Sequence, residues 1–284
     1  MSLELLRRHY LDQPQEVSIE TLAVCNAACT FCPYPTLERI GAKLPDAVLW
    51  DLVEQMASFK QPFFVSPFKV NEPLLDKRLQ GFCERIVEFV PHATLRLFTN
   101  GSPLTAHQID WIADIPTDRL DCLWVSLNSC DHQEYYKLMK LSYEATSSKL
   151  DELHADKQAG QFPHRVVLSR VVGDDPITDA AFMDGVWNRW PLFHPFLIKR
   201  DGWLGYVEPS SKLPPRSGCE RWFELNITAL GKAVLCCMDG KGEFPQGNVA
   251  TTSLLDIYNQ PRLRERRLKA LTRQGIEPCQ RCTY

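Results

Sequence analysis

The sequence predicts an α/β fold of parallel strands and helices, followed by a small cysteine-rich module. From about residue 15 to residue 200, short β-rich runs alternate with amphipathic segments. This alternation is typical of right-handed βαβ units, which wind into a barrel or a doubly wound sheet. A linker at Glu208–Gly218 then holds three prolines, three serines and a glycine, which indicates a boundary. We therefore expect two domains, residues 1–207 and residues 208–284.

The first domain is expected to contain six strands, because runs rich in β-branched and aromatic residues alternate with segments of helical periodicity. Asp46, just after a proline, favours a helix start as a cap or a first-turn anion. Two short runs around Gly231 predict a β-hairpin after the linker. The expected strands are Glu16–Val24, Phe63–Phe68, Thr94–Thr99, Cys122–Leu127, Arg165–Val172 and Phe196–Lys199; the expected helices are Asp46–Phe59, Leu74–Phe89, Thr105–Ala113, Tyr143–Lys157 and Thr178–Trp190; the hairpin joins Leu225–Leu230 to Lys232–Cys236, and helices follow between Ser253 and Thr272.

The composition excludes several classes of protein. The chain has 284 residues, of which 32 are basic and 35 acidic, so a net charge of −3 argues against a nucleic-acid partner held by bulk charge. No stretch approaches the roughly 18 apolar residues that span a bilayer, and the first residues lack the apolar core of a secretory signal. We expect a cytoplasmic protein with no membrane partner, in which the clustered members of its eleven cysteines bind metal rather than form disulfides.

Three cysteines, Cys25, Cys29 and Cys32, follow directly after the first predicted strand. Thiolates on one loop favour an iron–sulfur cluster or zinc. Three ligands leave one iron of a 4Fe–4S cluster open to a further ligand. An incomplete set of ligands at the end of a barrel's first strand therefore predicts a catalytic site. A structural zinc with a distant fourth ligand is the alternative that the spacing leaves open.

The spacing C-x3-C-x2-C, with Phe31 before the third cysteine, resembles the signature of the radical S-adenosylmethionine (SAM) enzymes. The resemblance covers residues 15–205 and implies a partial (β/α)6 TIM-like barrel. It also implies a 4Fe–4S cluster, SAM that is cleaved to a 5′-deoxyadenosyl radical, and a reduced flavodoxin or ferredoxin as electron donor. Short runs at the ends of successive strands resemble the family's SAM-binding elements, with Asn71 in place of a usual glycine; the residues implied as SAM contacts are Phe31, Asn71, Glu72, Thr99, Ser126, Asn128, Ser169 and Arg170.

A second set of cysteines, Cys219, Cys236, Cys279 and Cys282, lies in the C-terminal module. Four thiolates fill a 4Fe–4S cluster or a tetrahedral zinc site with no vacancy. The spacing resembles the twitch domain, the shortened SPASM module, which implies one auxiliary 4Fe–4S cluster in a small α+β module. A zinc knuckle that staples a short tail is the alternative.

The neighbouring Cys237 is left outside this set, because the Gly-x4-Cys count selects Cys236 and adjacent strand residues point to opposite faces. Two interpretations stay open. Cys237 is either a packed apolar thiol or a donor of a hydrogen atom to a substrate radical, as a cysteine is in some radical SAM epimerases.

The expected substrate is a polar small molecule that resembles a sugar or an aminocyclitol. It would be oxidised or epimerised, in a biosynthetic pathway, after a hydrogen atom is abstracted; in the oxidation the auxiliary cluster would accept the second electron. Arg200, Tyr206 and Glu208, near the sixth strand and the linker, are candidate substrate contacts. Two alternatives are a maturase of ribosomally made peptides and a non-catalytic scaffold that holds zinc or iron–sulfur clusters.

Overall fold

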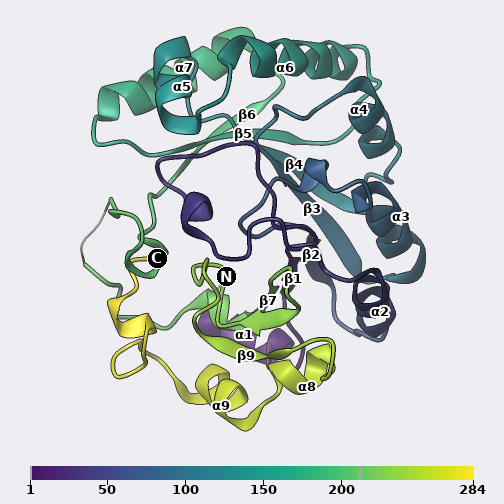
Figure 1. Cartoon of the computed structure of the whole chain (residues 1–284), viewed down its shortest axis with the longest axis vertical. Coiled ribbons are helices and arrows are strands. Elements are labelled where there is room, and N and C mark those ends of the chain that lie inside the picture. The colour runs from purple at the N-terminus through teal and green to yellow at the C-terminus, as the bar shows by residue number, and fades with distance from the viewer. Residues whose placement is uncertain (1, 211–212) are drawn as a thin grey trace.

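The structure, a computed structural model, describes residues 2–210 and 213–284 and is built on one sheet (Figure 1). The strand order is β6-β5-β4-β3-β2-β1-β7-β8-β9. Neighbouring strands from β6 to β7 run parallel, whereas β8 and β9 pair in antiparallel fashion. The strands are β1 (Glu16–Ile19), β2 (Phe63–Ser66), β3 (Ala93–Thr99), β4 (Leu120–Ser126), β5 (Val166–Val171), β6 (His194–Ile198), β7 (Glu224–Ile227), β8 (Lys232–Val234) and β9 (Pro245–Asn248).

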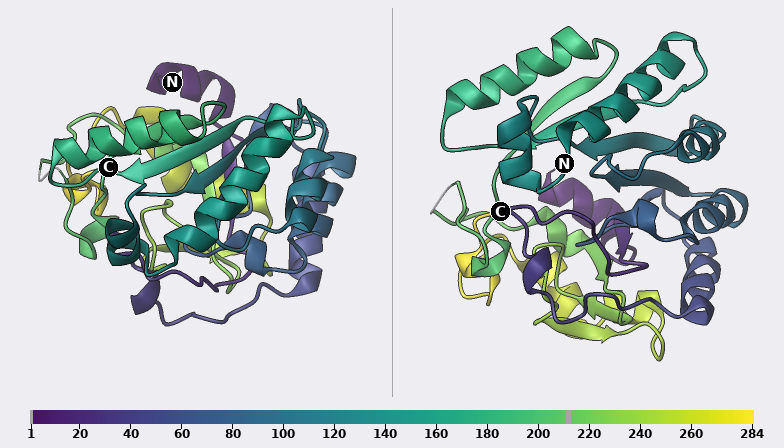
Figure 2. Two further views of the ribbon diagram at one scale, coloured as in Figure 1. Left: turned by 90° about the horizontal axis from the view of Figure 1, so that it is seen from above. Right: turned by 45° about the horizontal axis from the view of Figure 1, so that its top comes forward.

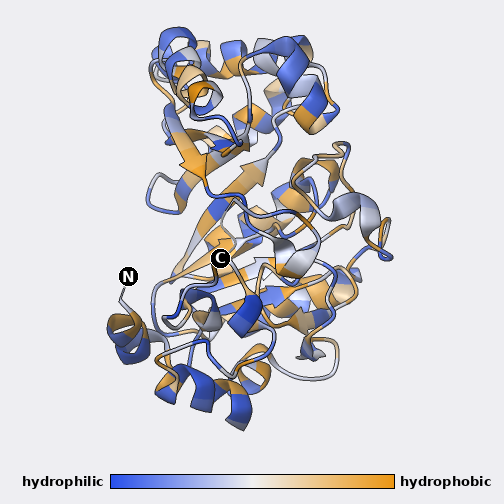
Figure 3. Ribbon diagram, turned by 90° about the vertical axis from the view of Figure 1, so that its left-hand side faces the viewer, coloured by the Kyte–Doolittle hydropathy of each residue, from blue (hydrophilic) through white to orange (hydrophobic). Residues whose placement is uncertain are grey.

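Helices cover the outer face of the parallel strands, and Figure 2 shows them lying along one side of the curved sheet. Alternate strand residues such as Val17, Ile19 and Val65 are buried against these helices and form the main core. Figure 3 shows the same division, with hydrophobic residues concentrated in the strands. The helices are α2 (Asp46–Ala57), α3 (Leu79–Phe89), α4 (Ala106–Ala113), α5 (His132–Met139), α6 (Tyr143–Gln158) and α7 (Pro176–Arg189).

This arrangement confirms the predicted α/β fold with a partial barrel. The first strand is shorter than expected, because the chain leaves the sheet after Ile19. Leu22 instead forms an isolated bridge with Lys43, and the Ala23 N–H donates to the Ala42 carbonyl at 2.8 Å. Because parallel strands share one direction, the loops after β1 to β5 meet at one edge of the sheet, which is where ligands bind in such folds.

The C-terminal region continues the same sheet. β7 lies parallel to β1, with Glu224 opposite Glu16, and β8 returns antiparallel to β7, so the predicted hairpin forms. Gly231 in its turn has a φ of +73°, which glycine adopts without strain. The boundary at residue 208 stays a prediction, and residues 211–212 of the expected linker lie outside the described residues. The other elements here are η4 (Glu220–Phe223), α8 (Leu254–Tyr258), α9 (Pro261–Lys269) and η5 (Cys279–Arg281).

Besides the short 3-10 helices, one strand and two α-helices of the described chain were not expected from the sequence: β9, α5 and the N-terminal helix α1 (Leu3–Tyr10). Helix α1 contacts η4 and lies beside the C-terminal region (Figure 1). Both unexpected helices begin at a side-chain cap, Ser2 for α1 and Asp131 for α5. Within the described part of the chain, no helix has the length and apolar character that crossing a bilayer requires.

Candidate functional site

The loop that carries Cys25, Cys29 and Cys32 follows the carboxyl end of β1, and all three thiols are half-buried. The Ala27 N–H donates to the Cys25 sulfur at 3.4 Å, and the Cys29 sulfur lies 3.5 Å from the Met139 sulfur. Burial raises the pKa of Cys25 to about 11 and that of Cys32 to about 12, and burial also raises the pKa of Cys29. These thiols therefore hold their protons at neutral pH until a metal displaces them.

A buried ion pair fixes this loop to the sheet. Arg39, on the loop, donates from Nε to one Glu20 oxygen at 2.6 Å and from its second nitrogen to the other at 2.9 Å. Glu20 follows β1 and also accepts the Ala229 N–H at 3.0 Å. The pair thus joins the first cysteine loop to the turn between β7 and β8. Sequence analysis missed both residues, although a carboxylate at the end of a buried strand was a signal for a partner.

Glu72 gathers two of the predicted SAM-binding segments. Its side chain is 1% exposed and accepts the Thr99 hydroxyl at 2.8 Å and the Asn100 N–H at 2.6 Å. Burial raises the pKa of Glu72 to about 7, and these hydrogen bonds act against that rise. Asn100 in turn donates to Asn26, beside Cys25, at 2.8 Å. The ends of β2 and β3 are therefore tied to the first cysteine loop.

Asn71 offers a buried donor without a partner at this same edge. Its Oδ1 accepts the Lys69 N–H at 3.0 Å, whereas its Nδ2 is buried and has no hydrogen-bond partner. An orphaned buried donor costs about 1–3 kcal/mol unless a ligand satisfies it. Together with three thiols and the Glu72 carboxylate, it fits a cluster and a ligand that bears both acceptor and cationic groups. Asn71, which stands where the family usually has a glycine, thus adds a polar group to the site.

The ends of β4 and β5 are joined by Asn128 and Ser169. Asn128 has a φ of +67°, and its Oδ1 accepts the Val171 N–H at 2.9 Å. Its Nδ2 lies 3.2 Å from the Met139 sulfur, which also contacts Cys29. Ser169 accepts the Trp124 indole N–H at 2.8 Å, and Ser126 is half-buried at the end of β4. These residues, as predicted SAM contacts, therefore lie at one sheet edge.

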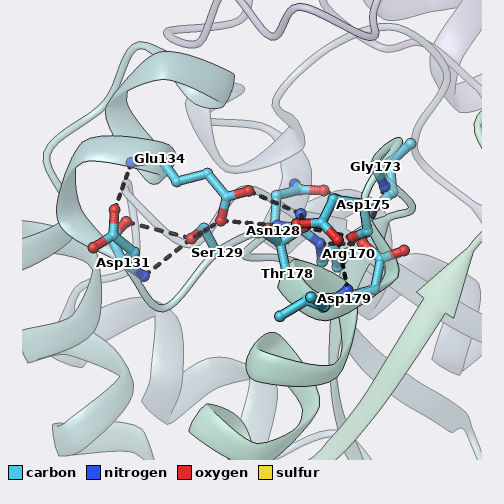
Figure 4. A network of polar contacts seen from close by, with 11 residues as sticks. Asn128, Ser129, Asp131, Glu134, Arg170, Gly173, Asp175, Thr178 and Asp179 are labelled. Carbon is cyan, nitrogen blue, oxygen red and sulfur yellow. Dashed lines mark hydrogen bonds and ion pairs between the residues drawn. The ribbon is translucent and has the colours of Figure 1, made fainter.

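Arg170 is held within a network of the protein's own groups (Figure 4). It pairs with Glu134 on α5 at 2.9 Å and with Asp179 on α7 at 2.7 Å. It also donates to the Asn128 carbonyl and to the Thr178 hydroxyl. These bonds use all five guanidinium N–H groups. Arg170 therefore positions the loop of Asn128, and its expected contact with SAM stays a prediction.

The second set of cysteines lines one cavity, together with Trp222. The Trp222 indole N–H donates to the Cys279 sulfur at 3.5 Å. Arg221 and Arg273 also line this cavity, and their charges offset those of thiolates. Cys237 is not among the lining residues, which favours its neighbour as the ligand. The four lining cysteines are Cys219, Cys236, Cys279 and Cys282.

Four thiolates that line one cavity can fill either a 4Fe–4S cluster or a tetrahedral zinc site. The donor chemistry and the cavity therefore fit an auxiliary 4Fe–4S cluster.

Cys237 directly follows Cys236 after β8 and is half-buried. Burial raises its pKa to about 11, whereas the positive charges of Arg221 and Lys69 act in the opposite direction. Lys69 donates to the Cys237 carbonyl at 3.2 Å. Burial likewise lowers the pKa of Lys69, against the effect of the surrounding thiols and carboxylates. The Cys237 side chain packs against the hydrophobic cluster that includes Trp222 and Phe223, with Arg221 and Lys69 nearby, so both interpretations of this thiol stay open.

The candidate substrate contacts lie in the segment after β6. Arg200 donates from Nε to the Glu208 carbonyl at 2.9 Å and pairs with Asp174, so the structure joins these two predicted residues through backbone and surface contacts. The Lys241 ammonium lies 3.9 Å from the centre of the Tyr206 ring. Burial, with Glu243 beside it, raises the pKa of Tyr206 to about 12. Their contact with a substrate stays a prediction.

A row of aromatic rings crosses the inner face of the sheet, and sequence analysis missed it. Phe68 stacks on Phe98 with centroids 4.9 Å apart, Phe98 lies 5.9 Å from Trp124, and Trp124 meets Phe196 edge-on at 5.3 Å. Phe196 is 48% exposed and the other three are half-buried. Strand residues two apart share a face, so Trp124 lies beside Ser126. That spacing was the available signal for an apolar floor next to the predicted SAM contacts.

Comparison with known proteins agrees with this geometry. Residues 219–283 match the model of the SPASM family, an iron–sulfur cluster-binding domain. A curated relative, the S-adenosyl-L-methionine-dependent 2-deoxy-scyllo-inosamine dehydrogenase of Niallia circulans, is 29% identical over 100 residues. That match spans 35% of this chain and 40% of the relative.

Two solved structures resemble the whole chain. The first is BtrN in complex with AdoMet and 2-DOIA, with a TM-score of 0.69, 17% identity, and coverage of 95% of this chain and 93% of that one. The second is SuiB of Streptococcus suis bound to the precursor peptide SuiA, with a TM-score of 0.71, 13% identity, and coverage of 92% and 68%.

The fold and the two cysteine sets define a partial-barrel iron–sulfur protein with a second, C-terminal cluster-binding region. The comparisons confirm the resemblance seen in the motifs. The fold resembles those of BtrN and SuiB, and residues 219–283 match the SPASM family.

Proposed function

We propose that this chain is a radical SAM enzyme that oxidises an alcohol group of a polar small molecule, an aminocyclitol or a related sugar-like compound. One observation carries the proposal: a single sheet holds both a three-cysteine loop beside Glu72 and a separate cavity lined by four cysteines. Three cysteine ligands leave one iron of a cluster open to a further ligand, whereas four cysteine ligands fill all the coordination positions of a second cluster.

The cysteines would hold two clusters, one at each set. Cys25, Cys29 and Cys32 would hold the first, with SAM at the open iron, and the four cavity cysteines would hold the auxiliary cluster. When bound, these groups would supply a 5′-deoxyadenosyl radical that takes one hydrogen atom from the alcohol carbon, and an acceptor for the second electron, while the hydroxyl proton would leave to solvent as the carbonyl forms. Reduced flavodoxin or ferredoxin is the proposed electron donor.

The chain's own residues orient and enclose the reactants. The Glu72 carboxylate can meet the cationic amino group of SAM, because its bonds to Thr99 and Asn100 fix both oxygens at the edge of the sheet. The free Asn71 amide can donate to an acceptor of the same ligand. Burial of these groups excludes water, which protects a radical from side reactions.

The row of aromatic rings on the inner face of the sheet supports a sugar-like ring as the substrate. The faces of Phe98 and Trp124 offer an apolar floor, on which the C–H face of a saturated ring packs while its hydroxyl and amino groups stay free for polar partners. Glu16, Arg96 and Asp121 form ion pairs at the same strands, with the Arg96 guanidinium 2.8 Å from Asp121. The named activity of the curated relative, an aminocyclitol dehydrogenase, points to the same chemistry.

Anaerobic reconstitution tests the proposal directly. We expect about eight iron atoms per chain, four for each cluster, and cleavage of SAM when dithionite is added. The variant in which Cys25, Cys29 and Cys32 are all alanine should keep about four irons and lose cleavage. Stoichiometric zinc without SAM cleavage in the wild-type chain would contradict an enzymatic role.

Cys237→Ala separates oxidation from epimerisation. In the proposed oxidation, the variant retains turnover, because no hydrogen atom returns to the substrate from sulfur. Cys130→Ala is the matched control, since Cys130 is also half-buried but belongs to neither set. Loss of turnover in Cys237→Ala alone, with both clusters intact, would replace the oxidation by an epimerisation. The probe is 2-deoxy-scyllo-inosamine, with product analysed by mass spectrometry.

A further inference from the structure

Lys69 connects the two candidate cluster sites through a side chain that is 3% exposed. Its ammonium nitrogen lies 3.4 Å from the Cys236 carbonyl, 3.2 Å from that of Cys237 and 2.9 Å from that of Asp239. An ammonium group has three N–H donors and no acceptor, so these three carbonyls match its full donor capacity. Lys69 therefore fixes the turn that begins at the auxiliary ligand Cys236.

The backbone of Lys69 belongs to the opposite site. Its N–H donates to the Asn71 side chain at 3.0 Å, and Glu72 follows directly with its bonds to Thr99 and Asn100. The main chain of Lys69 thus belongs to the predicted SAM-binding segment, whereas its side chain contacts the auxiliary region.

The same turn also touches the first cysteine loop. A Cβ added at Gly240 would lie 2.9 Å from Pro33 and 3.1 Å from the Trp203 ring, so these three residues are in close contact. The Trp203 indole N–H donates to the Phe31 carbonyl at 3.1 Å. The turn is therefore held on one side by Lys69 and on the other by Pro33 and Trp203.

The charge of Lys69 is not cancelled by a direct ion pair, since its donors go to carbonyls. Nearby Glu20 is paired with Arg39, and the Asp239 carboxylate accepts backbone N–H groups of its own loop, at 3.0 Å from Gly242 and 2.9 Å from Glu243. A buried charge is screened far less than one in water. The three carbonyls accept hydrogen bonds from the ammonium and so act against the lowering of the Lys69 pKa by burial.

We propose that Lys69 is a positioning residue that couples the two cluster sites. It holds the turn that carries Cys236, and its buried charge favours the reduced state of the auxiliary cluster, so that the cluster accepts an electron more readily. The inference rests on the proposed function, in which Cys236 is a ligand. Its physical basis is that reduction adds negative charge, and the charge and hydrogen bonds around a cluster set its potential.

Redox titration followed by electron paramagnetic resonance tests this inference on the reconstituted full-length chain. The auxiliary signal is the one that persists when Cys25, Cys29 and Cys32 are all alanine. Lys69→Met removes the charge at nearly constant side-chain length. We expect the reduction equilibrium of the auxiliary cluster in this variant to shift at least tenfold toward the oxidised state, which corresponds to about 59 mV for one electron. Lys69→Arg should keep most of the wild-type potential.

Lys232→Met is the matched control, because Lys232 is exposed on β8 of the same hairpin. Should Lys69→Met not accumulate, Lys69→Gln, which keeps a donor without the charge, gives the same comparison. An auxiliary potential in both neutral variants equal to that of Lys232→Met would overturn the inference, while intact iron content and SAM cleavage would leave the proposed function standing. Absence of a second cluster in the wild-type chain would instead refute the proposed function.

Discussion

Glu72 organises the first site at the scale of a single residue. Its carboxylate accepts hydrogen bonds from Leu74, Thr99 and Asn100, so one side chain orders the segments that follow β2 and β3. Burial of a carboxylate favours its neutral form, and the three donors recover only part of that cost. The cationic amino group of a bound ligand would supply the remaining stabilisation.

The titration of Glu72 predicts a pH dependence of stability. A carboxyl group whose pKa rises on folding, here from 4.5 to about 7, stabilises the folded state less as pH increases through that window. Glu72→Gln removes the titration. The free energy of unfolding of the variant relative to wild type should therefore increase between pH 4.5 and 7, by a value on the order of 3 kcal/mol.

Urea denaturation of the cluster-free chain at several pH values measures this difference. Glu88→Gln, on the exposed part of α3, controls for the loss of one carboxylate. Parallel pH curves for wild type and Glu72→Gln would show that Glu72 does not titrate in this window.

At the scale of elements, Arg170 ties three of them together. Arg170 lies on β5, and its side chain pairs with Glu134 of α5 and Asp179 of α7 (Figure 4). It also donates to the Asn128 carbonyl. Removal of one partner from a buried ion pair is strongly destabilising, because the other charges lose their compensation. The geometry of Asn128 at the end of β4 thus depends on a residue of the next strand.

Arg170→Lys tests this dependence. Lysine keeps the charge but has a compact ammonium with three donors, so it cannot make the five bonds of the guanidinium. We expect the free energy of unfolding to fall by about 1–3 kcal/mol, because buried acceptors lose their donors. Arg189→Lys is the control, since the Arg189–Asp151 pair is exposed and should contribute about 0–1 kcal/mol. Equal effects in the two variants, measured by urea denaturation, would contradict a buried network at Arg170.

Local pattern predicted most elements but not the polar networks between them. The alternation of apolar residues placed the central strands within a few residues, since Thr94–Thr99 was expected where β3 spans Ala93–Thr99. The contacts of Arg170 with Glu134 and of Lys69 with Cys236 could not be derived, because these partners lie 36 and 167 residues away in sequence. The cysteine sets were predictable because metal ligation imposes fixed spacing within short segments.

At the scale of the whole molecule, two regions share a single sheet. β7 pairs with β1 over four residue pairs although about 200 residues separate them, so the C-terminal region extends the barrel sheet rather than standing apart. No periodicity within either segment could predict this pairing, since each reads simply as a short buried strand. Its consequence is that the turn after β8 lies against the first cysteine loop, at Gly240.

Gly240→Ala probes this contact between the two regions. The added methyl group would lie 2.9 Å from Pro33 and 3.1 Å from Trp203, so the turn and the cysteine loop must move apart. We expect a loss of about 1–3 kcal/mol in the free energy of unfolding and altered paramagnetic signals from both clusters. Gly81→Ala is the control, because a Cβ there meets nothing within 4 Å and alanine favours helix α3. Equal stability of Gly240→Ala and Gly81→Ala, with both paramagnetic signals unchanged, would show that the turn does not couple the two sites. In that case, the added methyl group at the contact would alter the surroundings of neither cluster.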